Sequence, residues 1–303
     1  MSKSLGNVIA PEDILKKYGA DILRIWVASS DYAEDLRIDY SILDQHSDSY
    51  RKIRNTFRYL LGNLNDKFEN IDLEKIDFES LPELEKYILN KIYSLNERFT
   101  KYFKIYDFHN LYKELLNFCT TDLSAFYFDI RKDTLYCDPV SSEKRKSCIL
   151  VLNILLNSLL KWFAPILSFT TEEIYQLVCK KYKSIHLEKF ETFPKKFKND
   201  DLEKKWSELI KIRNICNISI EEKRANKEIG SSLEASINIR LKSNYKKIIS
   251  NIDMSELCIT SKAEVVYDDK VDVLVETKKA LGEKCPVCWK ISQEQCFRHP
   301  KNA

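Results

Sequence analysis

The N-terminal part of the chain combines one irregular segment with two short helical patterns. Residues 1–7 show neither a helical nor a strand period, so we predict a loop there. Residues 11–18 begin with a proline and two acidic residues and are followed by Gly19, which are the signals of a short helix. We predict that Asp21 caps a second helix directly after it, with an apolar stripe formed by Ile22, Leu23, Trp26 and Val27.

Residues 41–65 form the first long amphipathic pattern. Arg51, Arg54 and Arg58 line up on one face of the predicted helix, three and four positions apart. Such a basic stripe can be a solvated surface, or it can meet successive phosphates of an RNA. Both interpretations stay open, and the three arginines are our candidates for RNA contacts. Another, apolar face is formed by Leu43, Tyr50, Ile53, Phe57, Leu60, Leu61 and Leu64.

Four more helical patterns follow, separated by short turns that contain Asp, Pro or Ser. They cover residues 82–103, 107–129, 143–163 and 170–182 and predict an α-helical bundle. Aromatic residues line its apolar seam, and we interpret them as core side chains, with stacking on unpaired RNA bases as the alternative. These residues are Tyr87, Tyr93, Phe99, Phe118, Phe126, Tyr127, Phe128, Trp162 and Phe163.

The pattern changes after a lysine-rich link at residues 194–201. Residues 202–224 predict one more amphipathic helix. Three strands are then predicted at residues 236–241, 263–267 and 271–276. The first strand alternates, with one face formed by Ile237, Ile239 and Leu241. A small α/β subdomain therefore follows the bundle.

The C-terminal segment contains two short pairs of metal-ligating residue types. Cys285 and Cys288 form a Cys-x2-Cys pair, and Cys296 and His299 form a second pair after a loop of seven residues. This spacing lets four ligands close a tetrahedron around Zn²⁺, with chance clustering as the alternative. Four protein ligands leave no open coordination position, so we expect the Zn²⁺ to be structural. The predicted fold class is mainly α: a helical bundle, a small α/β subdomain and a C-terminal zinc knuckle.

Composition limits the classes of function. Of 303 residues, 44% are apolar, which is sufficient to bury a core in two or three units. The 49 Lys and Arg residues nearly balance the 46 Asp and Glu residues, so the net charge of +3 argues neither for nor against an RNA partner. The five glycines lie too far apart to form a glycine-rich phosphate cradle.

The compartment is predicted from apolar runs and cysteines. No apolar run approaches the roughly 20 residues that span a bilayer, and the N-terminal segment lacks the apolar core of a secretory signal. We therefore expect a cytoplasmic protein with no membrane partner. Single cysteines in apolar, helix-like surroundings favour reduced core thiols over disulfides. Six cysteines are scattered singly, most of them in such surroundings: Cys119, Cys137, Cys148, Cys179, Cys216 and Cys258.

The segment MSKSLGN holds the one residue that we expect to act in catalysis. Lys3 lies between Ser2 and Ser4, and Gly6 with Asn7 permits tight turns. A lysine in such a loop can close over a polyphosphate and stabilise its negative charge. The triplet Ser-Lys-Ser carries weight only if the downstream sequence agrees with this interpretation.

The downstream sequence does agree, because segments along nearly the whole chain resemble one enzyme family. The first 24 residues, MSKSLGNVIAPEDILKKYGADILR, are similar to the signature loop of class I aminoacyl-tRNA synthetases. Further segments resemble bacterial isoleucyl-tRNA synthetases: DYAEDLRI, YRKIRNTFRYLLGNL, DLSAFYFDIRKDTLY, KWFAPILSFTTEEIY and IGSSLEA. The valyl, leucyl and methionyl enzymes share the early loop, whereas IGSSLEA followed by a C-terminal Cys-x2-Cys-Trp favours isoleucine.

The resemblance implies a two-step reaction in the full enzyme. Isoleucine and ATP, bound with Mg²⁺, would give isoleucyl-adenylate and pyrophosphate, and the acyl group would then pass to tRNA. Lys3 matches a signature lysine that stabilises the ATP phosphates, and Ser2 and Ser4 belong to the same ATP phosphate loop. The resemblance also favours a monomer.

The resemblance further assigns a role to each part of the chain. Residues 1–44 would hold the signature loop and the end of the catalytic domain, and residues 45–200 the helical anticodon-binding domain. Residues 201–280 would form the small α/β C-terminal subdomain. Residues 281–303 would form the zinc knuckle.

Departures from the family pattern lead us to expect a C-terminal part of the enzyme. The first signature lysine is missing, and none of the four histidines lies in an H-x-G-H motif. The nucleotide-binding and editing domains are therefore expected upstream, and this chain alone is expected to be inactive. His299 also stands where the family usually has a cysteine ligand. The alternatives are a freestanding tRNA-binding module derived from a synthetase, or a valyl- or leucyl-type synthetase.

Overall fold

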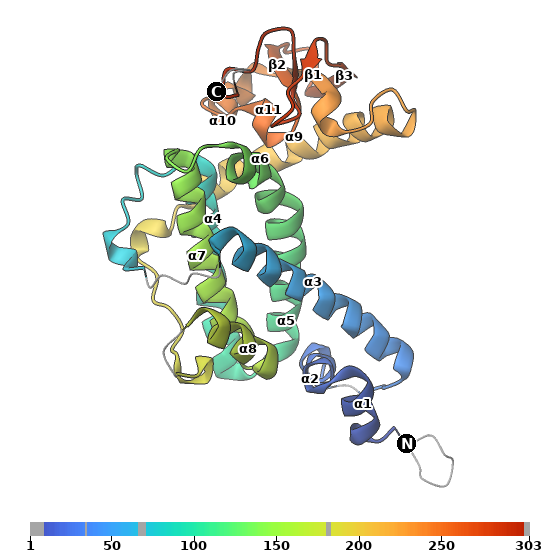
Figure 1. The fold of residues 1–303 in the computed structure, drawn as a ribbon, viewed down its shortest axis with the longest axis vertical. Helices are drawn as coiled ribbons and strands as arrows, with labels where there is room; N and C mark the ends of the chain where they lie inside the picture. The colour runs from blue at the N-terminus through green and yellow to red at the C-terminus, as the bar shows by residue number, and fades with distance from the viewer. Residues whose placement is uncertain (1–8, 34, 66–70, 180–182, 300–303) are drawn as a thin grey trace. The chain divides into compact units, whose positions relative to one another are not determined.

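The computed structural model describes residues 9–33, 35–65, 71–179 and 183–299. Most of the described residues are helical (Figure 1), so the prediction of a mainly α fold is confirmed. The chain divides into two compact units. We name Met1–Asp129 with Glu143–Lys198 the bundle unit, and Ile130–Ser142 with Asn199–Ala303 the sheet unit.

The bundle unit is built from helices at nearly the residues that the sequence pattern predicts. Its last predicted helix, expected at residues 170–182, begins two residues earlier than expected. The α-helices are α1 Pro11–Tyr18, α2 Ala20–Ser29, α3 Tyr40–Leu64, α4 Glu83–Ile105, α5 Phe108–Asn117, α7 Glu143–Phe163 and α8 Ser168–Val178. The π-helical segment η3 Phe118–Phe128 continues α5, and short 3-10 turns lie at η2 Leu73–Lys75, η4 Ile185–Leu187 and η5 Lys195–Phe197.

Aromatic side chains form much of the core of the bundle. The rings of Phe99 and Trp162 meet edge to face with centroids 5.0 Å apart, and the Trp162 indole N–H donates to the Asn96 amide oxygen at 3.0 Å. This hydrogen bond satisfies the one polar group of a buried ring. The prediction that the aromatic seam is core is confirmed except at Tyr93, which is half-buried.

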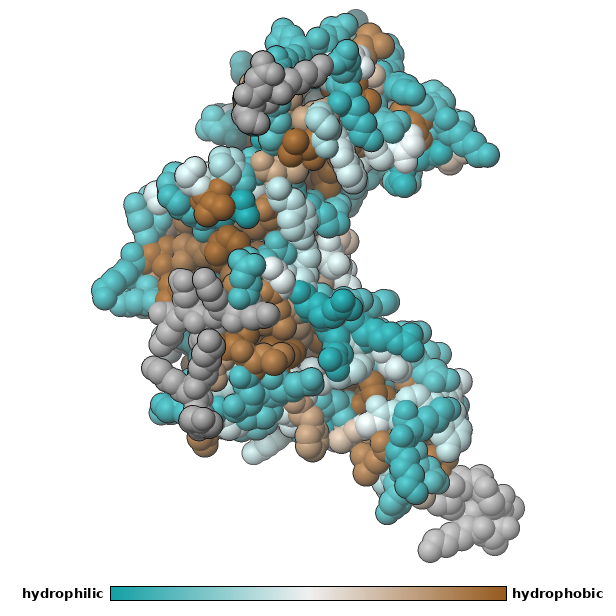
Figure 2. All heavy atoms as spheres, viewed as in Figure 1, coloured by the Kyte–Doolittle hydropathy of each residue, from teal (hydrophilic) through white to brown (hydrophobic). Residues whose placement is uncertain are grey.

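Helix α7 is a long apolar helix of the bundle. Among the described residues it alone is long and apolar enough to cross a membrane, yet 72% of its apolar window is buried inside the structure. This burial is typical of a core helix. Figure 2 shows hydrophilic residues over much of the surface of each unit on the face in view, with hydrophobic residues gathered over part of the bundle.

Helices α1 and α2 pack on the start of α3. Ile14, Ile22 and Leu43 form a buried cluster there, with exposed fractions of 2% or less. Half-buried apolar residues, among them Trp26 and Tyr50, surround this cluster. Helices α1 and α2 are therefore anchored on the bundle by apolar burial.

Polar contacts hold α2 against the start of α8. The Asp21 carboxylate accepts hydrogen bonds from the Thr170 backbone N–H at 2.8 Å and the Thr170 hydroxyl at 2.6 Å. The Arg24 guanidinium donates to the Ile166 and Pro165 carbonyls at 2.8 and 2.6 Å. The prediction that Asp21 caps its own helix is wrong, because Gly19 occupies that cap position and Asp21 caps α8 instead.

The sheet unit combines the end of one long helical run with α9 and a three-stranded sheet. Strand β1 lies between the other two strands, parallel to β2 and antiparallel to β3. The elements are α6 Asp129–Cys137, α9 Asp200–Ala225, η6 Ser232–Glu234, β1 Ala235–Leu241, η7 Ser243–Tyr245, α10 Lys246–Ile249, α11 Met254–Leu257, β2 Lys262–Tyr267, β3 Val273–Lys279, β4 Glu283–Lys284 and β5 Ile291–Ser292.

One face of the sheet is buried. The predicted face of β1, formed by Ile237, Ile239 and Leu241, is confirmed, with exposed fractions of 1% or less. Helix α9 contacts the sheet where the Ser219 and Thr277 hydroxyls lie 2.8 Å apart. The three predicted strands are therefore confirmed as one small sheet.

The six scattered cysteines divide into two groups. All are free thiols. Burial raises the pKa of the Cys119 thiol to about 12, which keeps this core thiol protonated. Cys137 and Cys179 are only half-buried, so the prediction of core thiols is wrong for these two. It is confirmed for Cys119, Cys148, Cys216 and Cys258.

Candidate functional site

Two short strands shape the C-terminal knuckle. Cys285 follows β4, and Cys288 lies in the turn that leads to β5. Trp289 adopts a left-handed backbone with φ of 64°, and its N–H donates to the Cys285 carbonyl at 3.0 Å. Gly282 has φ of 121°, and a side chain there would place Cβ 2.1 Å from the Ser292 carbonyl oxygen. The hairpin thus requires glycine at this position.

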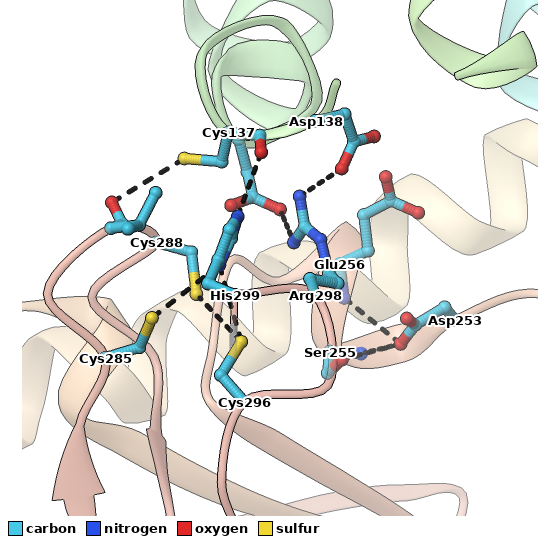
Figure 3. A network of polar contacts seen from close by, with 12 residues as sticks. Cys137, Asp138, Asp253, Ser255, Glu256, Cys285, Cys288, Cys296, Arg298 and His299 are labelled. Atoms are coloured by element: carbon cyan, nitrogen blue, oxygen red, sulfur yellow. Dashed lines mark hydrogen bonds and ion pairs between the residues drawn. The ribbon is translucent and has the colours of Figure 1, made fainter. Parts of the chain in front are cut away.

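The structure brings the four predicted metal ligands together (Figure 3). Their ligand atoms all lie within 4.8 Å of one another. The sulfurs of Cys288 and Cys296 are 3.9 Å apart. The Nδ1 atom of His299 lies 3.6 Å from the Cys285 sulfur and 3.4 Å from the Cys296 sulfur.

These separations fit a tetrahedral metal ion. Zinc–sulfur bonds of about 2.3 Å and zinc–nitrogen bonds of about 2.0 Å imply tetrahedral edges of roughly 3.8 Å between sulfurs and 3.5 Å between sulfur and nitrogen. The observed separations of 3.9, 3.6 and 3.4 Å agree with those edges. Three thiols and one imidazole therefore form a donor set that suits a closed, structural metal centre.

The pKa values of the Cys285 and Cys288 thiols are shifted in opposite directions. The pKa of Cys285 is lowered to about 6: burial raises it, but N–H groups of Cys288 and Val287 donate to the sulfur and outweigh burial. Burial raises the pKa of Cys288 to about 12, and the neighbouring thiols of Cys285 and Cys296 add to the rise. Without a bound ion, the Cys288 thiol therefore stays protonated at neutral pH. A bound dication would supply the charge that stabilises its thiolate.

The knuckle also contacts the end of α6, and this contact was not predicted from the sequence. The Nε2–H group of His299 donates to the Cys137 carbonyl at 2.9 Å. Arg298 forms ion pairs with Asp133, at 2.5 Å, and with Asp138. No local pattern signals these partners, because about 160 residues separate them from the knuckle.

The three candidate arginines lie together on the exposed face of α3 in the bundle unit. Arg51 forms an ion pair with Asp48 at 2.7 Å, with side chains 71% and 64% exposed. A pair this exposed contributes little to stability. Arg54 donates to the Tyr50 hydroxyl at 3.2 Å, and that hydroxyl lies 2.7 Å from the Thr170 hydroxyl. Arg54 therefore also belongs to a network within the bundle.

The predicted ATP phosphate loop lies outside the described residues. Ser2, Lys3 and Ser4 all fall in this part. The described chain begins at Ile9, two residues before α1. The role of the loop therefore stays a prediction.

Family comparisons assign the fold and the early segment to one class of protein. Residues 85–239 match the family described as the anticodon-binding domain of tRNA ligase. Residues 1–39 match the family described as tRNA synthetases class I (I, L, M and V). The first match covers half of the chain, from α4 to β1, so the chain belongs to the family of tRNA ligase anticodon-binding domains.

Curated relatives narrow the similarity to one type of ligase. The chain is 69% identical to the isoleucine–tRNA ligase of Pelagibacter ubique (strain HTCC1062), over 99% of this chain and 33% of that protein. It is 42% identical to the isoleucine–tRNA ligase of Agrobacterium fabrum (strain C58), over 97% of this chain and 31% of that protein. The Caldicellulosiruptor saccharolyticus isoleucine–tRNA ligase is 43% identical, over 96% and 32%. The chain spans about a third of the length of these relatives.

One solved structure has a distant likeness. A chain of the ternary LeuRS-tRNA-LeuAMS complex from Agrobacterium radiobacter K84 shares 15% identity with a TM-score of 0.48. The match covers 66% of this chain and 23% of that one. A likeness at this level carries no argument about the site.

Proposed function

We propose that this chain supplies the ATP loop and the tRNA-binding part of an isoleucine–tRNA ligase. The observation that carries the proposal is the 69% identity to a curated isoleucine–tRNA ligase, which extends over 99% of the chain. Because this identity extends over the bundle, the sheet and the knuckle, it supports the same function for all three parts of the chain. In the full-length protein, the reaction is activation of isoleucine with ATP and Mg²⁺, followed by transfer to tRNA.

The bundle unit is the proposed tRNA-binding part. Its family supports an anticodon partner, and the exposed face of α3 offers Arg51, Arg54 and Arg58 to the RNA backbone. Free thiols throughout the described chain support a reducing compartment, so we place the protein in the cytoplasm. The family resemblance favours a monomer.

The knuckle is the proposed Zn²⁺ site. Cys285, Cys288, Cys296 and His299 would hold the ion, which supplies positive charge and cross-links the hairpin to the C-terminal turn. His299 takes the place of a cysteine, which leaves the bound site one unit less negative. All four positions are filled by protein atoms, so the ion would have no role in the reaction.

ATP–pyrophosphate exchange by the full-length protein that contains this chain tests the proposal. Isoleucine is expected to stimulate exchange far more than valine or leucine. Stimulation by valine or leucine without isoleucine would favour a valyl- or leucyl-type enzyme instead. Filter binding of this chain to tRNA transcripts tests the partner separately, and a chain that does not prefer an isoleucine tRNA over a valine tRNA would count against the proposal.

The alternative of a freestanding tRNA-binding module is tested by the gene sequence directly upstream of Met1. An in-frame lysine codon directly before Met1, preceded by catalytic sequence, would exclude the module. A stop codon in its place, with tRNA binding retained by the chain, would favour it.

A further inference from the structure

The end of α6 contacts both halves of the knuckle (Figure 3). The Cys137 carbonyl accepts the His299 Nε2–H hydrogen bond, and the Cys137 thiol lies 3.7 Å from the Val287 carbonyl. Val287 stands between the first two ligands, and His299 is the last ligand. One helix end therefore touches the turn that carries each pair of ligands.

The Cys137 carbonyl determines which nitrogen of His299 faces the sulfurs. An imidazole that donates from Nε2 carries its free electron pair on Nδ1. Nδ1 is the atom that lies 3.6 and 3.4 Å from the sulfurs of Cys285 and Cys296. The α6 carbonyl thus orients the ring and fixes the tautomer that a metal ion requires.

Two carboxylates of the same helix end hold the neighbour of that ligand. Arg298 precedes His299, and its two terminal nitrogens reach Asp133 and Asp138 separately. The Arg298 side chain is 22% exposed, and the two carboxylates are 27% and 14% exposed. Charge-assisted hydrogen bonds between partly buried groups are stronger than those between exposed groups. These contacts therefore restrict the position of His299, the last ligand.

We propose that Asp133 and Asp138 are positioning residues for the metal centre, so that its affinity for the ion depends on the end of α6. The inference rests on the proposed Zn²⁺ site. The contacts are reciprocal: if a docked helix end strengthens metal binding, then bound metal stabilises the helix end by the same free energy. The knuckle is therefore not a separate module but one half of a two-part site.

Competition for Zn²⁺ against a chromophoric chelator measures the dependence. The double variant Asp133→Asn, Asp138→Asn removes both charges that face Arg298 and keeps side-chain size. Its Zn²⁺ affinity is expected to fall about 10-fold, the low end of the 10–100-fold cost of losing a direct partner of a metal ligand, because the two carboxylates reach His299 only through Arg298. The matched control is Glu276→Gln, which removes the carboxylate that pairs with Arg240 at 3.1 Å on the exposed sheet surface. The control is expected to bind Zn²⁺ as the parent does.

Hydrogen exchange on the unaltered chain measures the reverse effect and needs no variant. Amides of residues 133–138 are expected to exchange faster after Zn²⁺ removal, while amides of α4 in the bundle unit keep their rate. Equal Zn²⁺ affinities for the double variant and the parent, or exchange at residues 133–138 that ignores Zn²⁺, would overturn the inference. A parent chain that binds no Zn²⁺ would overturn the proposed metal site together with it.

Discussion

The Asp21 carboxylate caps a helix that lies far from it in the sequence. Local rules assign an acid near a helix start to the cap of its own helix. Here the side chain is 7% exposed and accepts hydrogen bonds from Phe169 and Thr170, some 148 residues away, at the start of α8. Buried N–H groups at a helix start need such acceptors, so Asp21 fixes where α8 begins.

The substitution Asp21→Ala tests this role. It leaves the Thr170 N–H without its acceptor, whereas the Thr170 hydroxyl keeps the Tyr50 hydroxyl as a partner, and the free energy of unfolding is expected to fall by about 1–3 kcal/mol. Urea unfolding followed by circular dichroism measures the change. Asp13→Ala removes an exposed acid from the first turn of α1 and is expected to change stability by no more than about 0.5 kcal/mol. Equal effects of the two changes would contradict the cap.

Lys3 is the second residue whose proposed role can be tested by a single substitution. The substitution Lys3→Ala in the full-length protein removes the cation proposed to stabilise the ATP phosphates. The rate of ATP–pyrophosphate exchange is expected to fall about 10²–10³-fold, the usual cost of removing one group that stabilises the transition state. Lys16→Ala, at an exposed position of α1, is the control and is expected to leave the rate unchanged. An unchanged rate in Lys3→Ala would remove this lysine from the chemistry.

At the scale of elements, α3 combines two faces with different partners. Its apolar face packs in the bundle through residues such as Ile53 and Phe57, and its arginines lie on the exposed face. The three arginines are not equivalent, because Arg54 also bonds to Tyr50 within the bundle. A test of RNA binding is therefore clearest at Arg51 and Arg58.

The double variant Arg51→Glu, Arg58→Glu tests the basic stripe. Its affinity for tRNA is expected to fall, and the slope of log affinity against log salt is expected to fall by about 1 for each phosphate that the variant no longer binds. Lys101→Glu with Lys104→Glu on α4 makes the same change in charge at exposed positions elsewhere. If both variants bind tRNA equally well, the stripe is a solvated face.

The helices could be predicted because their cause is local. A 3.6-residue apolar period and a proline or acid at the start place α1, α3 and α7 almost to the residue. The helical run from α5 was expected to end at residue 129, but it continues through the π-helical η3 into α6 and ends at Cys137. The partners of α6 lie far along the chain: Arg131, for example, pairs with Glu256 at 2.7 Å.

At the scale of the whole molecule, the proposed metal site combines residues that are close in sequence with residues that are far apart. Its four ligands fall within 15 residues, so their spacing alone predicts the cluster that the structure contains. Their outer contacts from Asp133, Cys137 and Asp138 could not be predicted, because only the folded sheet unit brings those residues to the knuckle.

Metal content is a prediction about the complete chain. Elemental analysis is expected to find about one Zn²⁺ per chain. The double variant Cys285→Ser, Cys288→Ser removes two ligands and is expected to lose the ion, whereas Cys179→Ser in the bundle unit is expected to retain it. Undiminished Zn²⁺ in the double variant would exclude the site.

The two units are not consecutive in the sequence, and this limits how they can be expressed separately. Residues 130–142 belong to the sheet unit although bundle residues flank them on both sides. A polypeptide truncated after residue 198 would keep this segment but lose the Glu256 carboxylate that the buried Arg131 contacts at 2.7 Å. No single cut releases both units whole, so separate expression requires residues 130–142 to be replaced by a linker in one half and appended to the other.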